Sequence, residues 1–89
     1  MNLTSTSAPA SLHGLVAVVT GGAKGIGLGI ARELAQAGCR IALWDFDEKA
    51  LDGAEQALSG EGFNVRTFKV DVSSVEQVEA AVARLLASH

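Results

Sequence analysis

The chain has 89 residues, a formal net charge of −3 and 48% hydrophobic residues, which fits one small folded domain. Its seven Lys and Arg residues are scattered and outnumbered by ten acids, so the charge offers no basic surface for nucleic acid. No apolar run reaches membrane-spanning length, one cysteine excludes an internal disulfide, and no Cys/His pattern predicts a metal site.

The N-terminal segment, residues 1–11, is rich in Ser, Thr and Ala and lacks the basic start and apolar core of a signal peptide. We expect a flexible arm there and a reducing, cytoplasmic setting for the protein. From residue 12 onward, short β-branched apolar runs alternate with longer segments of helical period. This alternation predicts parallel strands joined by helices.

The first apolar run, residues 15–19, predicts a strand that is covered on both faces. The run Thr20-Gly21-Gly22-Ala23-Lys24-Gly25-Ile26-Gly27 follows it and opens a helical pattern, a position that suits a loop around a dinucleotide pyrophosphate. The glycines let backbone N–H groups approach a phosphate. A plain strand-to-helix turn is the alternative interpretation. The predicted contacts in this loop are Gly21, Ala23, Lys24, Gly25, Ile26 and Gly27.

A first helix is expected over about residues 25–37, and Gly38 is expected to end it. Its predicted apolar stripe is Ile26, Ile30, Leu34 and Ala37. Residues 40–45 predict a second buried strand, after which Asp47 is placed to cap a second helix. That helix is expected to stop at Gly60, and its predicted stripe is Leu51, Ala54 and Leu58.

Residues 63–70 alternate in character and predict a third strand nearer the sheet edge. Ser73 and Glu76 predict a capping box at the start of a last helix. The broad apolar face of that helix is expected to be Val75, Val78, Val82, Leu85 and Leu86.

The whole pattern predicts an α/β fold with a Rossmann-like parallel sheet in βαβαβα order. Right-handed crossovers place the strands in the spatial order 3-2-1, with the first two helices on one face. A doubly wound fold continues with a fourth strand beside the first. We therefore expect residues 12–89 to be the first half of a dinucleotide-binding domain, truncated before the fourth strand, with an open apolar edge at the first strand.

Asp45 ends the second strand, where its carboxylate can accept hydrogen bonds from both hydroxyls of an adenosine ribose. A carboxylate there would repel the 2′-phosphate of NADP, so Asp45 favours NAD as the cofactor. Lys24 favours NADP instead, because a cation in the glycine loop can pair with a 2′-phosphate. An equal alternative is that Lys24 is a solvated side chain in a turn. Capping is the alternative role for Asp45, and Asp47 is better placed for it.

Asp71 ends the third strand and can accept a hydrogen bond from the adenine amine, while the backbone of Val72 reads the edge of the ring. The alternative role for Asp71 is to cap the last helix, but Ser73 is the better candidate for that cap. Phe46 is expected to contact the same cofactor, and Trp44 either packs against a helix or touches adenine. No residue is assigned a catalytic or metal-binding role.

On these motifs the chain resembles the N-terminal third of the short-chain dehydrogenase/reductase family. The family's Thr-Gly-x-x-x-Gly-x-Gly loop is matched by Thr20, Gly21, Gly25 and Gly27, its NAD-selecting acid by Asp45, and its Asp-Val pair by Asp71 and Val72. The resemblance implies hydride transfer between a nicotinamide and an alcohol or carbonyl carbon, by a tyrosine, a lysine and a serine. The sequence has no tyrosine, so this catalytic set is not assigned. A homo-oligomer, usually a tetramer, is also implied for the parent enzyme.

Three functions follow as alternatives. The first is the NAD-binding portion of an oxidoreductase, of which the 89 residues are a fragment. The second is a stand-alone nucleotide-binding module without catalysis. The third is an interaction fragment that completes its sheet with a strand from a partner.

Overall fold

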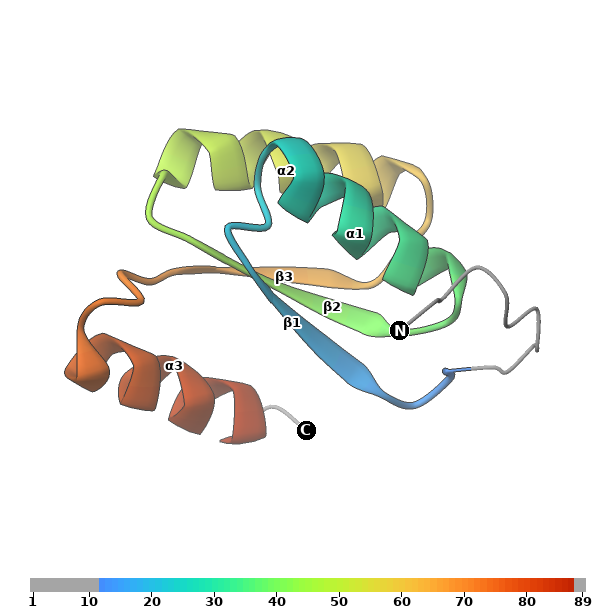
Figure 1. The fold of residues 1–89 in the computed structure, drawn as a ribbon. Helices are drawn as coiled ribbons and strands as arrows, with labels where there is room; N and C mark the ends of the chain where they lie inside the picture. The colour runs from blue at the N-terminus through green and yellow to red at the C-terminus, as the bar shows by residue number, and fades with distance from the viewer. Residues whose placement is uncertain (1–11, 88–89) are drawn as a thin grey trace.

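The computed structural model describes residues 12–87, so the arm expected over residues 1–11 lies outside the described part of the chain. Strands and helices alternate throughout the described residues (Figure 1), which confirms the predicted α/β order. The elements are β1 (Val16–Thr20), α1 (Gly25–Gln36), β2 (Arg40–Asp45), α2 (Glu48–Gly60), β3 (Val65–Lys69) and α3 (Val75–Ala87).

The three strands form a parallel sheet in the spatial order β1-β2-β3, as the crossover rule predicts. Thr20 at the end of β1 lies opposite Trp44 of β2, and Asp45 lies opposite Lys69 at the end of β3. The carboxyl ends of all three strands therefore meet at one edge of the sheet. Figure 1 shows α1 and α2 over one face of the sheet and α3 against the other.

The core has one apolar layer on each face of the sheet, because successive side chains of the central strand point in opposite directions. Ile41 and Leu43 of β2 belong to the layer under α1 and α2, whereas Ala42 and Trp44 belong to the layer under α3. The α2 stripe of Leu51, Ala54 and Leu58 is buried as predicted. Since β2 is covered on both faces, it holds the carboxyl edge of the sheet in place.

The apolar stripe predicted for α1 is wrong at two positions. Ile26 is 83% exposed and Ile30 is 46% exposed, and the buried residues of the helix are Ala31 and Ala35. The physical reason is the rotation of α1 about its own axis, which turns Ala31 and Ala35 toward the core and leaves Ile26 and Ile30 on a face that the described residues leave exposed. Leu34 packs against the core only in part.

The last helix begins differently from the prediction. Ser74, not Ser73, accepts a hydrogen bond from the Gln77 N–H at 3.2 Å, and so Ser73 and Glu76 do not form the expected capping box. Ser73 instead directs its own hydrogen bonds to Asp71. The buried residues of α3 are Ala81 and Leu85, with Val78 partly buried. The exposed members of the predicted face are Val75, Val82 and Leu86.

Smaller differences concern the ends of elements. β1 runs one residue later than expected, and Val18 on it is 41% exposed, so this strand is not covered on both faces by the described residues. β3 is shorter than the predicted run of residues 63–70. α2 includes Gly60, and the left-handed glycine after it is Gly62, with a φ of 91°. Within residues 12–87, no helix combines the length and the apolar character needed to cross a membrane.

Candidate nucleotide-binding site

The loop between β1 and α1 is shaped by its glycines. Gly21 and Gly25 have φ angles of 64° and 54°, in the left-handed region that favours glycine. A Cβ atom on Gly27 would overlap the carbonyl group of Gly21, so the first and last glycines of the motif pack directly on each other. The Gly21 N–H donates to the Trp44 carbonyl oxygen at 2.8 Å, which ties the turn to β2. The loop is therefore tight, and it leaves open space at Gly21 and Gly25, where an added Cβ would meet nothing within 4 Å.

The start of α1 differs from the starts of the other two helices. Its N-cap residue, Lys24, has extended backbone and makes no side-chain capping bond, and the first turn contains no acid. By contrast, the Asp47 side chain accepts from the Ala50 N–H at 3.0 Å at the start of α2, where Glu48 adds an acid to the first turn. The positive end of the α1 dipole thus has no compensating side chain at its own cap, and an anion would be stabilised there.

Asp45 joins the glycine loop to the start of α2. Its Oδ2 accepts a hydrogen bond from the Ala23 N–H at 3.2 Å, and its Oδ1 accepts one from the Asp47 N–H at 3.0 Å. The residue is half-buried at the end of β2. Because each carboxylate oxygen has a second lone pair, Asp45 can still accept hydrogen bonds from a ligand.

Lys24 and Asp47 form an ion pair beside Asp45, with 3.1 Å between Nζ and Oδ2. The two side chains are 63% and 45% exposed. The capping bond from the Ala50 N–H, followed by the hydrogen bond from Lys24, holds the pKa of Asp47 below its usual range. Lys24 is therefore not simply a solvated side chain.

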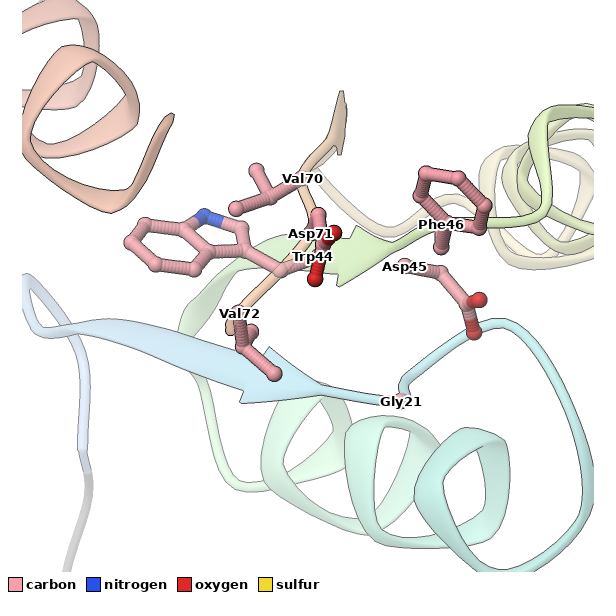
Figure 2. Close-up of a pocket in the computed structure, with 7 residues that line it drawn as sticks. All are labelled: Gly21, Trp44, Asp45, Phe46, Val70, Asp71 and Val72. Carbon is pink, nitrogen blue, oxygen red and sulfur yellow. The ribbon is translucent and has the colours of Figure 1, made fainter. Parts of the chain in front are cut away.

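A cavity of about 210 Å³ opens at the carboxyl ends of β2 and β3. It is lined by Gly21, Trp44, Asp45, Phe46, Val70, Asp71 and Val72 (Figure 2). Figure 2 shows the Asp45 carboxylate directed toward the chain that follows β1, with the Trp44 ring on the far side of the cavity. Phe46 and Val72, which line it, are 64% and 58% exposed, so both offer apolar surface to a ligand.

Asp71 is held rigidly on this cavity. Its Oδ1 accepts from the Ser73 hydroxyl at 2.6 Å and from the Ser73 N–H at 2.9 Å, while its own N–H donates to Gln77 Oε1 at 2.9 Å. The Ser73 hydroxyl, followed by the Ser73 N–H, lowers the pKa of Asp71. Asp71, two residues after the end of β3, is thus an acceptor that Ser73 holds in place and that stays ionised near neutral pH.

The structure brings half of the predicted site residues onto one cavity and leaves the others in the loop beside it. Those on the cavity are Gly21, Asp45, Phe46, Asp71 and Val72. Those in the loop and at the start of α1 are Ala23, Lys24, Gly25, Ile26 and Gly27. Sequence reasoning missed Val70, which follows β3 directly and lines the cavity. The rule that ligands bind at the carboxyl ends of parallel strands, which identified Asp71, could also have identified Val70.

Trp44 packs under α3 and also lines the cavity, so its helix-packing interpretation is confirmed. The ring is 5% exposed and lies 6.4 Å from Phe68 between ring centroids. Its Nε1 atom is buried and has no hydrogen-bond partner among the described residues. Cys39 is buried, as a small apolar residue would be, and this burial raises the pKa of its thiol.

The lowered pKa values of Asp47 and Asp71 predict a loss of stability in acid. The folded protein releases these protons more readily than the unfolded chain, so the stabilisation is complete above the ordinary pKa of Asp, about 3.9. It is lost as the pH falls through the lower folded values. Asp47→Asn keeps the cap but does not titrate, so urea midpoints measured from pH 6 to pH 2 should fall less steeply for this variant. An equal fall in the two proteins would contradict the prediction.

Comparison with known proteins gives a consistent assignment. Residues 15–89 match the family model described as short chain dehydrogenase. The NADP-dependent dehydrogenase clz5 of Cochliobolus lunatus is 41% identical over 78 residues, which cover 84% of this chain and 25% of that protein. The chain spans roughly a quarter to a third of the length of the curated relatives it matches.

Two solved structures share the fold closely. A metagenomic short-chain oxidoreductase in complex with NADP matches with a TM-score of 0.84 and 36% identity, over 90% of this chain and 36% of that one. An NAD⁺-bound xylitol dehydrogenase matches with a TM-score of 0.81 and 37% identity, over 85% of this chain and 29% of that one. From the family match and the shared fold, the chain belongs to the short chain dehydrogenase family.

Proposed function

We propose that residues 12–87 bind the adenosine and pyrophosphate part of NAD at the carboxyl edge of the sheet. The observation that carries the proposal is the uncapped start of α1, which adjoins the open space at Gly21 and Gly25 in the glycine loop. A pyrophosphate bears negative charge and needs several N–H donors, and this helix end supplies both the donors and the favourable dipole. The residues present therefore fit the cofactor.

The adenosine is assigned to the cavity between Asp45 and Asp71. The ribose hydroxyls donate to Asp45, which lies next to the loop, and the adenine lies between the exposed side chains of Phe46 and Val72. The adenine amine then donates a hydrogen bond to the Asp71 carboxylate, which the hydrogen bonds from Ser73 hold in place. NAD is proposed over NADP because a 2′-phosphate would meet the Asp45 carboxylate.

For the whole protein, we propose an oxidoreductase that acts on an alcohol or carbonyl compound. The nicotinamide, when bound, supplies the hydride acceptor or donor, and the residues described here bind and orient the rest of the cofactor. Membership of the family and the dehydrogenases among its relatives support this activity. Homo-oligomeric assembly and a cytoplasmic location remain predictions.

A titration with NAD tests the proposed binding. The sequence contains one tryptophan, Trp44, and it lines the cavity, so its emission should change saturably as NAD is added. ADP should give a similar change, because the proposed contacts lie on the adenosine and pyrophosphate. Trp44→Phe should remove the optical signal while calorimetry still detects binding. If neither fluorescence nor calorimetry detects NAD at millimolar concentration, the proposed function is wrong.

A further inference from the structure

Three charged side chains meet where β2 joins α2: Lys24, Asp45 and Asp47. The Asp45 carboxylate accepts from the N–H of Ala23, the neighbour of Lys24, and from the N–H of Asp47. Lys24 Nζ and Asp47 Oδ2 form an ion pair at 3.1 Å. Asp45 therefore contacts the backbone next to both members of this ion pair. The cluster contains two carboxylates and one ammonium, so its formal charge is −1.

Asp47 uses its two carboxylate oxygens for different tasks. Oδ1 accepts from the Ala50 N–H and caps α2, whereas Oδ2 holds Lys24. Lys24 is the one cation in the glycine loop sequence, and it adjoins the Asp45 carboxylate to which the ribose is assigned. Lys69 Nζ is also nearby but lies over the Phe46 ring, 5.7 Å from its centroid. Asp47 thus pairs with the ammonium group of Lys24, the cation with which a phosphate on the ribose would otherwise pair.

We propose that Asp47 is a specificity-determining residue that disfavours a 2′-phosphorylated ribose by keeping Lys24 paired. This inference rests on the proposed function. A 2′-phosphate carries about −1.5 to −2 charge and would enter a cluster that is already negative. To pair with Lys24 it must first displace Asp47. Selectivity for NAD is accordingly shared between Asp45, which repels the phosphate, and Asp47, which withholds the cation.

Asp47→Asn in the full 89-residue chain is the direct test. Asparagine is as good an N-cap as aspartate, so the variant removes the charge and keeps the helix start. Dissociation constants for NAD and NADP are measured by calorimetry for both proteins. We expect the ratio of the NADP constant to the NAD constant to fall by about threefold to tenfold, with a smaller effect at high salt.

Two controls isolate the ion pair. Glu48→Gln removes one acid from the same turn of α2 and should change the ratio less than about twofold. In a Lys24→Met background, Asp47→Asn should lower the ratio by less than about twofold, because no cation is left to release and only the general effect of one negative charge remains. Thermal unfolding of each variant verifies that the fold is retained.

The outcomes separate this inference from the proposed function. If the wild-type chain binds neither nucleotide, the proposed function is overturned, and this inference with it. If NAD binds but Asp47→Asn leaves the ratio unchanged, only the role of Asp47 is overturned. An equal fall in Glu48→Gln, or an undiminished fall in the Lys24→Met background, would assign the effect to general charge and would also overturn it.

Discussion

Replacing Gly27 by alanine is expected to weaken NAD binding at least about 100-fold and to lower the free energy of unfolding by about 2–4 kcal/mol. The added Cβ would overlap the carbonyl group of Gly21 and lie 3.2 Å from the Gly22 Cα. These are backbone atoms, so no side-chain rotation relieves the contact. The loop must open, and the N–H groups at the start of α1 then lose their position. Urea unfolding and NAD calorimetry measure the two effects.

Gly29→Ala is the matched control for this substitution. Gly29 lies on the same helix, and a Cβ there meets nothing within 4 Å. Because alanine is a better helix former than glycine, this variant should gain about 0.5–1 kcal/mol and bind NAD like the wild type. A Gly27→Ala protein that binds NAD within about threefold of the wild type would contradict the proposed packing of the loop.

The second large effect is expected at Phe68. Phe68→Ala should lower the free energy of unfolding by about 3–5 kcal/mol, a large fraction of the stability of a domain this small. The side chain is 2% exposed, and it fills the layer between the sheet and α3. The Arg66 and Arg84 guanidinium carbons lie 5.3 and 5.0 Å from the centre of its ring, so the substitution also removes two cation–π contacts.

Urea unfolding followed by the emission of Trp44 measures this loss, since Trp44 packs beside Phe68. Leu86→Ala on α3 removes apolar volume from a side chain that is 71% exposed, and should cost less than about 0.5 kcal/mol. A loss below about 1 kcal/mol for Phe68→Ala would show that the layer under α3 contributes little to the fold.

The order of the elements and of the strands was predictable because each depends on a local pattern and one rule of handedness. The Asp47 cap and the end of α1 near Gly38 were predictable for the same reason. The buried face of α1 was not. Which of its residues face the sheet depends on the rotation of the helix about its own axis, and both Ile26–Ile30 and Ala31–Ala35 have the spacing of a helical stripe.

For the candidate site, the positions of Asp45 and Asp71 followed from their places at strand ends. The ion pair between Lys24 and Asp47 did not, because 23 residues separate its partners and no local pattern connects them. The cap of α3 was misplaced by one residue. Two hydrogen bonds from Ser73 to Asp71 take that serine out of the capping position, and Ser74 caps instead.

The Asp45 carboxylate joins two segments that are 22 residues apart, so its geometry exists only after both βα units have docked. A ligand that needs this geometry binds the folded chain and not the unfolded one. Its binding therefore adds RT ln(1 + [L]/Kd) to the free energy of unfolding, about 2.7 kcal/mol at one hundred times Kd. The cofactor would thus act as a cross-link between the two halves of the site, and the melting temperature would rise with its concentration.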